Sequence, residues 1–463
     1  MKTLRRQSES HVRRRRGAAF IIALLVTTML AGLVLIFARS MKGSAEASRS
    51  EEGRAHAQWI VRGALEAVCD DLALAIQSGE PPRLTTVGVQ AQPLGEGLYW
   101  IIGRAKQTDD VGAGPEDVAF GLVSEAGKLN LNQAEGSELR ELPGMTDSLV
   151  QTLDQYINRE QDADEPGQEQ AENSRVTLQT VDELLRVPGF TAEILDGEDA
   201  NRNGVLDPNE DDGDASLPAD NGDGRLDRGL RDFVTVYSRE ANTSNAGQPR
   251  VFLNRGGQGL GELLQANVEE DRYGQLVSTI PPNRPFQNVL DFFVRGGLEP
   301  EEFAKLHDKV TVDGNETMAG RIDVYAAPPE VLDAEARLEP GDGAVIVAAR
   351  PQLEGTEAPG DFAWLIEAIG QERAVAAGRA LTHRSLQFSV DILATDRRGR
   401  GFVRQRYVID CLPLVRGEAA GPRVLMMQDL TSLGWPLDPE ILTALRQGSS
   451  QDDMTSRYGA DAI

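Results

Sequence analysis

The strongest hydrophobic pattern in the sequence is an uninterrupted run of residues without charge, from Ala18 to Ala38. A helix rises about 1.5 Å per residue, so this run is long enough to cross the roughly 30 Å hydrocarbon layer of a bilayer. It leads into Arg39, Lys42 and further helix-forming sequence, whereas an ordinary secretory signal would lead into a small-residue cleavage site. The pattern therefore predicts a membrane-spanning helix that is retained.

Helical periodicity continues beyond the apolar run and stops at Ser78-Gly79 and Pro81-Pro82. We expect one helix over residues 18–77, whose second half packs on a folded domain through a single apolar stripe. The residues that form this stripe are Trp59, Val61, Leu65, Val68, Leu72 and Ile76.

Two pairs of strand-like segments flank a long stretch with helical periodicity. Residues 98–105 and 118–124 are rich in branched and aromatic side chains, and residues 386–394 and 402–411 alternate apolar and polar positions across a turn. Each pair predicts a β-hairpin. The expected fold class is α+β, with a long N-terminal helix packed on a small antiparallel sheet and a large, mainly helical insertion domain.

A weak internal repeat lies within the insertion. The segment GKLNLNQA at residues 127–134 is echoed by GRIDVYAA at residues 320–327, and each is followed by helical sequence. The turn LPGMT at residues 142–146 returns as VPGFT at residues 187–191. Two related helical units are therefore predicted.

Charge is distributed very unevenly. Residues 1–17 carry a net charge of +6, which leaves −32 on the rest of a chain whose total is −26. Basic residues beside a membrane helix stay in the cytoplasm, so the chain after Lys42 is expected on the far side of the membrane. The acidic body is expected to repel polyanions.

The junction of the two regions, four arginines followed by Gly17 and the apolar Ala18-Ala19-Phe20, resembles a type IV prepilin leader. The resemblance implies cleavage after Gly17 by a prepilin peptidase and a mature chain that begins at Ala18. Most pilins carry a glutamate at the fifth mature position, which is Ile22 here. The K-type minor pseudopilins of bacterial type II secretion are known for lacking it. An unpaired carboxylate in lipid is energetically costly. A subunit with no neighbour above it would not need a glutamate at this position.

The order GKLNLNQA, LPGMT, ELLRVPGFT also resembles the helical domain of K-type minor pseudopilins. The resemblance covers about residues 13–411, more loosely between 240 and 320, and leaves the C-terminal residues unexplained. The domain division that it implies is a leader at 1–17, the helix at 18–77, a pilin-like α+β domain in two parts at 78–124 and 351–411, a helical insertion at 125–350, and an extension at 412–463.

This resemblance implies a non-enzymatic role. The chain would cap the tip of a periplasmic pseudopilus and initiate its assembly during protein export. It would cross the inner membrane once, with its body in the periplasm. Its partners would be other minor pseudopilins and the inner-membrane secretion platform, with no nucleic acid among them.

Two alternatives stay open. The Pro-Gly turns also resemble helix-hairpin-helix DNA-binding turns, so a membrane-tethered DNA-uptake protein would share them. Phosphate binding needs a basic neighbourhood, whereas acidic residues such as Glu138, Glu141, Asp182 and Glu183 flank these turns. A type IV pilus minor pilin would share the leader and differ in its secretion partner.

One segment, residues 199–210, fits the twelve-position calcium loop. Oxygen-bearing side chains stand at positions 1, 3, 5, 9 and 12, and Gly204 stands at position 6, where the loop turns sharply. The resemblance to K-type pseudopilins also implies Ca²⁺ in this domain. The expected ligands are Asp199, Asn201, Asn203, the Val205 carbonyl, Asp207 and Glu210.

A second, weaker loop follows at residues 220–227. Aligning Gly224 with the glycine position places Asn221, Asp223 and Asp227 at coordinating positions, but positions 1 and 12 become Ala219 and Leu230. A second ion site and a solvated acidic loop are equally compatible with this pattern.

The remaining reactive side chains predict no active site. The four histidines are scattered and form no metal or triad pattern with the two cysteines. Cys69 and Cys411 could form one disulfide in an oxidising compartment, or they could be two separately buried thiols.

Overall fold

The structure is a computed structural model of the 463-residue chain. It describes residues 4–79, 82, 87, 89–103, 118–158, 176–213, 215, 220–254, 258–279, 284–351 and 360–459.

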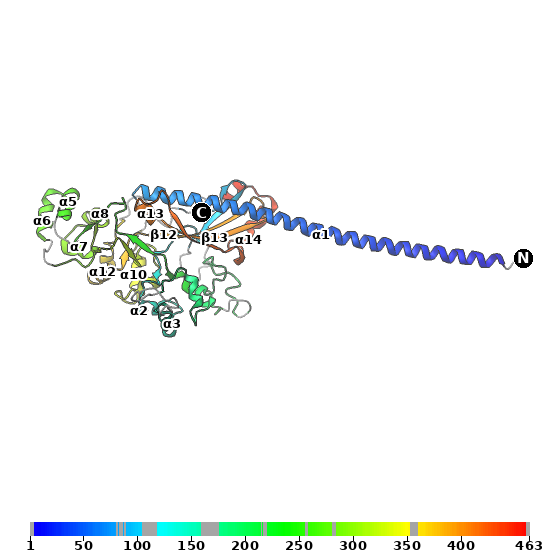
Figure 1. Cartoon of the computed structure of the whole chain (residues 1–463), viewed down its shortest axis with the longest axis horizontal. Coiled ribbons are helices and arrows are strands. Elements are labelled where there is room, and N and C mark those ends of the chain that lie inside the picture. Colours follow the sequence, from blue (N-terminus) through cyan, green and yellow to red (C-terminus); the bar gives the residue numbers. More distant parts are fainter. Residues whose placement is uncertain are drawn as a thin grey trace, which may run out of the picture.

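A single helix, α1 (Leu4–Gln77), forms one end of the molecule and extends far beyond the folded body (Figure 1). It ends where the sequence predicts, since Ser78 and Gly79 follow with φ of +80° at Gly79. From Phe20 onward it is long and apolar enough to span a membrane, and none of its most apolar window is buried in the protein. Phe20 and Ile36 are each 70% exposed. Such a surface is expected in lipid rather than in water.

The second half of α1 packs on a sheet, as its apolar stripe predicts. Val61, Val68 and Leu72 are buried there. The prediction is wrong for Trp59, whose side chain is 68% exposed. The Arg62 guanidinium lies over its indole ring, 5.5 Å from the ring centroid. Ala57, Ile60 and Ala64 are buried on this face of α1.

The sheet is antiparallel, in the order β1-β2-β12-β13-β14. The predicted C-terminal hairpin is confirmed, with Val390 opposite Tyr407. These strands are β1 (Gln92–Leu94), β2 (Gly97–Ile102), β12 (Gln387–Asp396), β13 (Phe402–Asp410) and β14 (Arg423–Asp429).

The predicted hairpin between residues 98–105 and 118–124 is wrong. β2 forms its hairpin with the short β1 strand instead, and its other edge pairs with β12. β3 (Val123–Ser124) also pairs with β12, and among the described residues of the two predicted partners only an isolated bridge between Ile102 and Phe120 joins them. Both strands therefore depend on a partner that lies more than 260 residues away in sequence.

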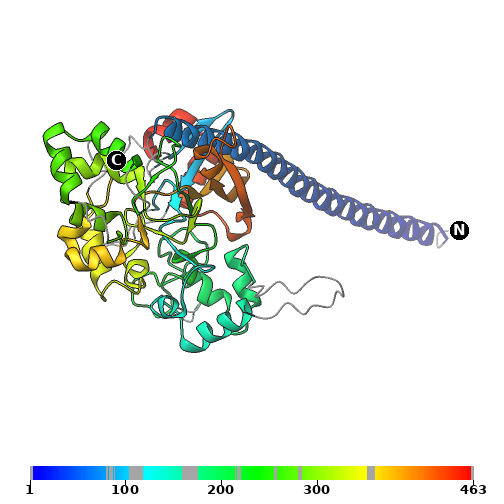
Figure 2. The same cartoon turned by 60° about the vertical axis from the view of Figure 1, so that its left-hand side comes forward.

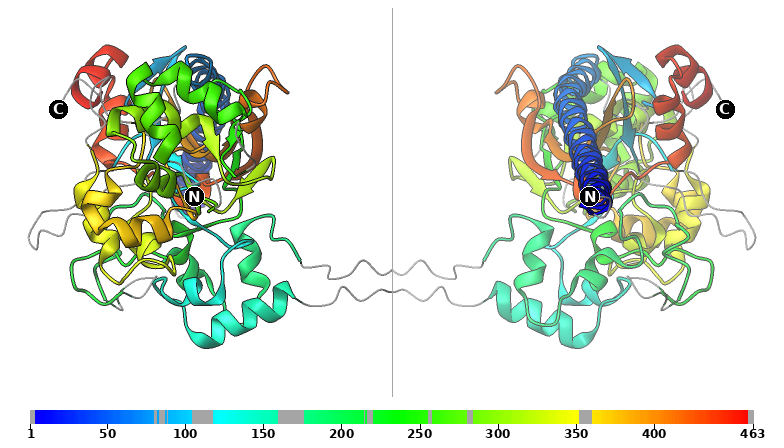
Figure 3. Two further views of the ribbon diagram at one scale, coloured as in Figure 1. Left: turned by 90° about the vertical axis from the view of Figure 1, so that its left-hand side faces the viewer. Right: turned by 90° about the vertical axis from the view of Figure 1, so that its right-hand side faces the viewer.

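The last two helices of the C-terminal extension cover the face of the sheet opposite α1. Leu98, Trp100 and Leu393 point to this face because side chains alternate along a strand. They pack with Leu437, Ile441, Leu445 and Met454, so the sheet is buried on both sides. The extension contains α13 (Leu412–Val415), β14, η4 (Thr431–Leu433), α14 (Pro439–Gln447) and α15 (Gln451–Tyr458), and its last two helices are red in Figure 3.

The helical insertion consists of three units (Figure 2). The three units share one hydrophobic core. Each unit opens and closes with a parallel pair of two-residue strands. The first runs through β4 (Leu129–Asn130), α2 (Gly136–Arg140), α3 (Asp147–Ile157), η1 (Val181–Arg186), α4 (Ala192–Asp196), η2 (Leu230–Asp232) and β5 (Val234–Thr235).

The second and third units have the same outline. The second runs through β7 (Val251–Phe252), α5 (Gln258–Asn267), α6 (Glu270–Thr279), α7 (Val289–Gly296), α8 (Pro300–Leu306), η3 (His307–Lys309) and β8 (Val310–Thr311). The third runs through β10 (Ile322–Asp323), α9 (Pro329–Asp333), α10 (Asp342–Ala349), α11 (Leu365–Ile369), α12 (Gln371–Ala377) and β11 (Leu381–Thr382). An antiparallel pair, β6 (Arg239–Ala241) and β9 (Thr317–Ala319), lies between units.

The sequence repeat corresponds to a reciprocal contact between the first and third units. A Cβ added to Gly127 would lie 3.1 Å from the Cβ of Ala326, and one added to Gly320 would lie 2.7 Å from the Cβ of Gln133. The first glycine of each repeat therefore packs against the seventh residue of the other. This contact explains why both repeats begin with glycine.

The core of the insertion extends past the predicted boundary at residue 350. Phe362, Leu365, Ile369 and Leu381 belong to it, because the third unit closes only when β11 pairs with β10. The part of the sheet domain that follows the insertion therefore begins after β11.

A buried ion cluster joins the insertion to the sheet. Glu240 on β6 is 4% exposed and accepts hydrogen bonds from Arg384 Nε at 2.9 Å and Thr382 Oγ1 at 3.0 Å. Its carboxylate also lies 3.0 Å from Arg250 Nη1 and 3.7 Å from Arg321 Nη1. One carboxylate thus contacts guanidinium groups from three segments of the chain, and Asp308 also pairs with Arg250 and Arg384.

Two buried histidines, far apart in sequence, pack together beside this cluster. The rings of His307 and His383 lie 4.6 Å apart, and His383 stacks on Phe362. Burial lowers the pKa of both imidazoles. At His307, the nearby carboxylates of Asp308 and Asp361 oppose this lowering. At His383, the proximity of His307 lowers the pKa further, and Glu240 opposes the lowering. No pattern in the sequence predicts this pair.

We expect the two buried histidines to contribute a loss of stability below about pH 6.5, because unfolded histidines bind protons that the buried pair resists. For each histidine the loss is up to about 1.4 kcal/mol per pH unit until the folded pKa is reached. Thermal unfolding at pH 7.5 and pH 5.5 measures this loss, and His383→Phe should reduce it. An equal loss in the variant would assign the pH dependence to other groups.

Cys69 and Cys411 lie in the same hydrophobic cluster, where α1 packs on the sheet. Both are free thiols in the structure. Burial raises the pKa of the Cys69 thiol to about 11, and Glu66 and Asp70 add to this. A bond between the two cysteines stays a prediction.

Candidate metal centre

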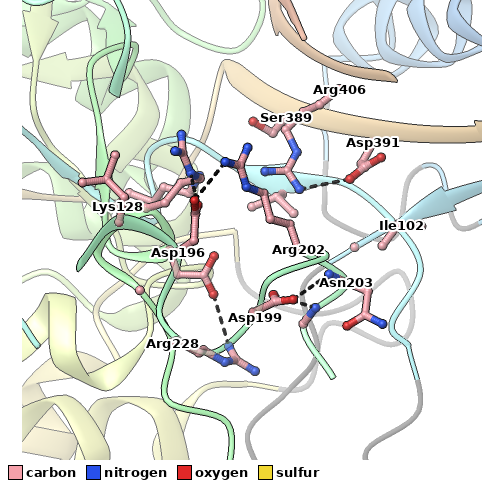
Figure 4. Close-up of a pocket in the computed structure, with 17 residues that line it drawn as sticks. Ile102, Lys128, Asp196, Asp199, Arg202, Asn203, Arg228, Ser389, Asp391 and Arg406 are labelled. Atoms are coloured by element: carbon pink, nitrogen blue, oxygen red, sulfur yellow. Dashed lines mark hydrogen bonds and ion pairs between the residues drawn. The ribbon is translucent and has the colours of Figure 1, made fainter. Parts of the chain in front are cut away.

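The predicted calcium loop, residues 199–210, follows α4 and lies against the sheet (Figure 4). Its first residue shows how the loop is folded. The Asp199 carboxylate accepts hydrogen bonds from the backbone N–H groups of Asn203 and Gly204, both at 2.9 Å. The chain turns through positive φ at Arg202 (+57°) and Gly204 (+78°). A residue other than glycine rarely adopts this conformation, so the turn at Arg202 depends on the surrounding bonds.

The other predicted ligands are held in the same way. Asn201 Oδ1 accepts from Asn203 N at 2.9 Å, and Asn203 Oδ1 accepts from Val205 N at 2.8 Å. Glu210 reaches back across the loop, since its two carboxylate oxygens accept from Ala200 N at 2.9 Å and Asp207 N at 3.1 Å. The loop is therefore closed by its last residue, as in a twelve-position calcium loop.

The acids of this loop are unusually buried. Glu210 is fully buried, and burial together with Asp199 and Asp207 raises its pKa to about 7. Burial and the proximity of Asp232 raise the pKa of Asp199 to about 6. Burial and mutual repulsion disfavour the ionised form of these carboxylates, and a bound cation would stabilise that form.

The donor set fits calcium better than a transition metal. In the described part of the chain, no three His, Cys, Asp or Glu side chains form a group that could hold a metal by themselves. The loop would also need the amide oxygens of Asn201 and Asn203 and the Val205 carbonyl. Such a mixture of carboxylate, amide and carbonyl oxygens is typical of Ca²⁺ sites.

The second loop is folded similarly but uses a residue that the sequence did not suggest. Asn221 Oδ1 accepts from Asp223 N at 2.8 Å, and Asn221 Nδ2 donates to Asp227 at 3.0 Å. Glu198, which is 6% exposed, accepts from Asn221 N at 3.2 Å and Asp227 N at 2.9 Å. Glu198 thus takes the place that Glu210 has in the first loop. It lies before its loop in the sequence, so a linear motif does not find it.

Charged side chains line a small cavity of about 60 Å³ between the first loop and the sheet (Figure 4). Asp196 accepts hydrogen bonds from Arg202 at 3.0 Å and Arg231 at 2.8 Å. On the opposite side, Asp391 of β12 accepts from Arg406 at 3.0 Å. The pairs of Asp196 hold the loop to the end of α4 and to η2, whereas the Asp391 pair lies within the sheet.

The two Pro-Gly turns serve as helix caps. The side chains of Thr146 and Thr191 accept hydrogen bonds from Leu149 N and Ile194 N at the starts of α3 and α4. Arg140, beside the first turn, is paired with Asp147 at 2.7 Å. Acids remain in excess around both turns, and this disfavours contact with DNA phosphates.

The sequence matches no protein-family model, and it matches no curated protein. Among solved structures it is similar to a chain of the GspK-GspI-GspJ complex from the enterotoxigenic Escherichia coli Type 2 Secretion System. The two are 12% identical, the match covers 82% of this chain and 98% of that chain, and the TM-score is 0.35.

Proposed function

We propose that this protein is a minor pseudopilin of a type II secretion system, anchored in the inner membrane with its body in the periplasm. The observation that carries the proposal is α1, one helix that is fully exposed and apolar at one end and buried on the sheet at the other. A helix of this kind suits insertion in the bilayer and lateral packing with similar helices in a fibre. The expected partners are other minor pseudopilins and the inner-membrane secretion platform.

A tip position is supported by two features. Ile22 offers no carboxylate to the amine of a subunit above it. The helices α5 to α8 of the insertion lie at the end of the molecule opposite the protruding part of α1 (Figure 1). A neighbour stacked on that end would meet the insertion, so we propose that the chain caps the fibre and initiates its assembly.

Processing at Gly17 tests this proposal. In cells with a type II secretion system, wild-type protein should begin at Ala18, and Gly17→Val should keep residues 1–17 and fail to co-purify with the other minor pseudopilins. Mass spectrometry of the N-terminal peptide measures processing. Gly32→Val is the matched control, because no atom lies within 4 Å of a Cβ added there. If the wild-type protein were unprocessed and still supported secretion, the N-terminal segment would have to be interpreted as a plain membrane anchor.

We also propose that residues 199–210 bind Ca²⁺ through Asp199, Asn201, Asn203, Val205, Asp207 and Glu210, and that Glu198 with Asn221, Asp223 and Asp227 forms a second, weaker site. The support is the set of side-chain oxygens that the loop's backbone N–H groups hold in place, together with the buried carboxylate of Glu210. Bound Ca²⁺ would offset the repulsion between these acids and add its binding free energy to folding.

Calorimetry on the detergent-solubilised chain should show tight Ca²⁺ binding that Asp199→Ala/Glu210→Ala abolishes, while the weaker binding of the second loop remains. At one hundred times the dissociation constant, Ca²⁺ should stabilise the wild type by about 2.7 kcal/mol, and a chelator should remove this gain. Glu141→Ala/Asp147→Ala, which removes two exposed acids outside the loops, should bind normally. Unchanged binding in the first variant would exclude these two ligands.

A further inference from the structure

The metal loop and the C-terminal extension meet at one buried residue of the sheet, Arg404 on β13. Its side chain is fully buried. Nη1 donates to the Asn201 carbonyl at 2.5 Å, and Nη2 donates to the Arg202 carbonyl at 2.6 Å. The same guanidinium is paired with Asp391 of β12 at 2.7 Å. Two of its three nitrogens therefore depend on the folded loop.

The backbone of Arg404 holds the extension. Its carbonyl accepts from Leu430 N at 2.9 Å, and its N–H donates to Thr431 Oγ1 at 3.1 Å. The loop also contacts the extension directly, because Asn203 Nδ2 donates to the Pro436 carbonyl at 3.1 Å. Loop, sheet and extension are thus joined within a few residues.

Pro436 lies between two apolar anchors of the extension. Trp435 packs edge-on against Trp100 at 5.7 Å and against Phe402 at 5.5 Å. Leu437 is buried in the cluster that holds α14 on the sheet. A shift of Pro436 would therefore disturb both contacts.

The metal-free loop is the weak point of this arrangement. The carboxylates of Asp199, Asp207 and Glu210 share one closed loop, where like charges repel one another unless a cation lies between them. If the loop opens, Arg404 loses two acceptors while it stays buried, and the bond from Asn203 to the extension is lost. The guanidinium would keep Asp391 but Nη1 would be left without an acceptor, and an unsatisfied buried charged donor is unfavourable.

We propose that Ca²⁺ in the loop at residues 199–210 fastens the C-terminal extension to the sheet, with Arg404 as the positioning residue that joins them. This inference rests on the proposed Ca²⁺ site. Coupling between two sites is reciprocal, so a weakened extension must lower the affinity of the loop for Ca²⁺ by the same factor.

Hydrogen exchange on the full chain in detergent tests the coupling. With Ca²⁺, amides of α14 and α15 should exchange more slowly than with a chelator. If calorimetry shows binding while exchange in these helices stays the same, the coupling is overturned and the Ca²⁺ site stands. Absence of any binding would overturn both.

The reciprocal measurement uses a residue that does not contact the loop's ligands. Trp435→Ala should lower Ca²⁺ affinity at least about fivefold, the lower end of typical couplings. Trp59→Ala removes an exposed tryptophan on α1 and should leave the affinity unchanged. Arg404→Lys keeps the charge beside Asp391 but cannot bond both carbonyls, so it should lower the affinity and abolish the effect of Ca²⁺ on α14. A folded Trp435→Ala variant with wild-type affinity would refute the inference.

Discussion

A chain lacking residues 20–37 is expected to be released from the membrane as a folded, soluble body. Twelve of the deleted residues are Leu, Ile, Val or Phe. At about −0.3 to −0.6 kcal/mol each, they contribute roughly 4 to 7 kcal/mol to insertion. None of the most apolar window packs on the body, so the deletion removes no contact of the sheet or the insertion. Membrane fractionation together with thermal unfolding of the body measures both effects.

Substitutions in the same helix sharpen this test. Leu25→Arg/Leu30→Arg should cost about 5 to 7 kcal/mol of insertion, because each arginine in the middle of a bilayer costs about 2.5 to 3.5 kcal/mol. Leu25→Ala/Leu30→Ala keeps the helix uncharged and should remain bound. A deleted chain that still sediments with membranes would show that another part of the protein anchors it.

Glu240→Gln is expected to destabilise the body by about 3 to 5 kcal/mol, the usual cost of breaking a buried ion pair. The substitution leaves the guanidinium groups of Arg250, Arg321 and Arg384 without their shared carboxylate. Although burial opposes ionisation, these three groups hold the pKa of Glu240 well below its usual range. Its stabilising contribution is therefore present above about pH 4.5 and is lost as the pH falls further.

Denaturant unfolding of the two proteins at neutral pH measures the loss. Glu339→Gln is a suitable control, because Glu339 forms an ion pair with Arg373 at 3.0 Å but is exposed. Such a surface pair contributes about 0 to 1 kcal/mol. Equal losses in the two variants would mean that the Glu240 cluster is no more than a surface-like ion pair.

Elements with a strong local signal were predictable from sequence. The end of α1 at Gln77 is marked by Ser78-Gly79, and the hairpin of β12 and β13 is marked by alternation on both sides of a turn. The closed loop at residues 199–210 was indicated by oxygen-bearing side chains and a glycine at fixed spacings, and Ca²⁺ binding there stays a prediction. In each case the determining residues are neighbours in sequence.

Elements that depend on distant partners were not predictable. β2 and β3 look like a hairpin locally, but β12 offers them a longer edge. The parallel strand pairs of the insertion contain two residues each, too few to show a period. Glu198 joins the second loop from outside its motif, and His307 meets His383 only in the folded chain.

The unbroken course of α1 has a mechanical consequence. No proline interrupts it between Phe20 and Gln77, and its last turns are embedded in the sheet domain. A push or pull along its axis at the bilayer is therefore transmitted to the sheet as a displacement of equal size, without an intervening joint to absorb it. Axial motion of the exposed, apolar half of α1 is therefore expected to move the whole folded body by the same distance.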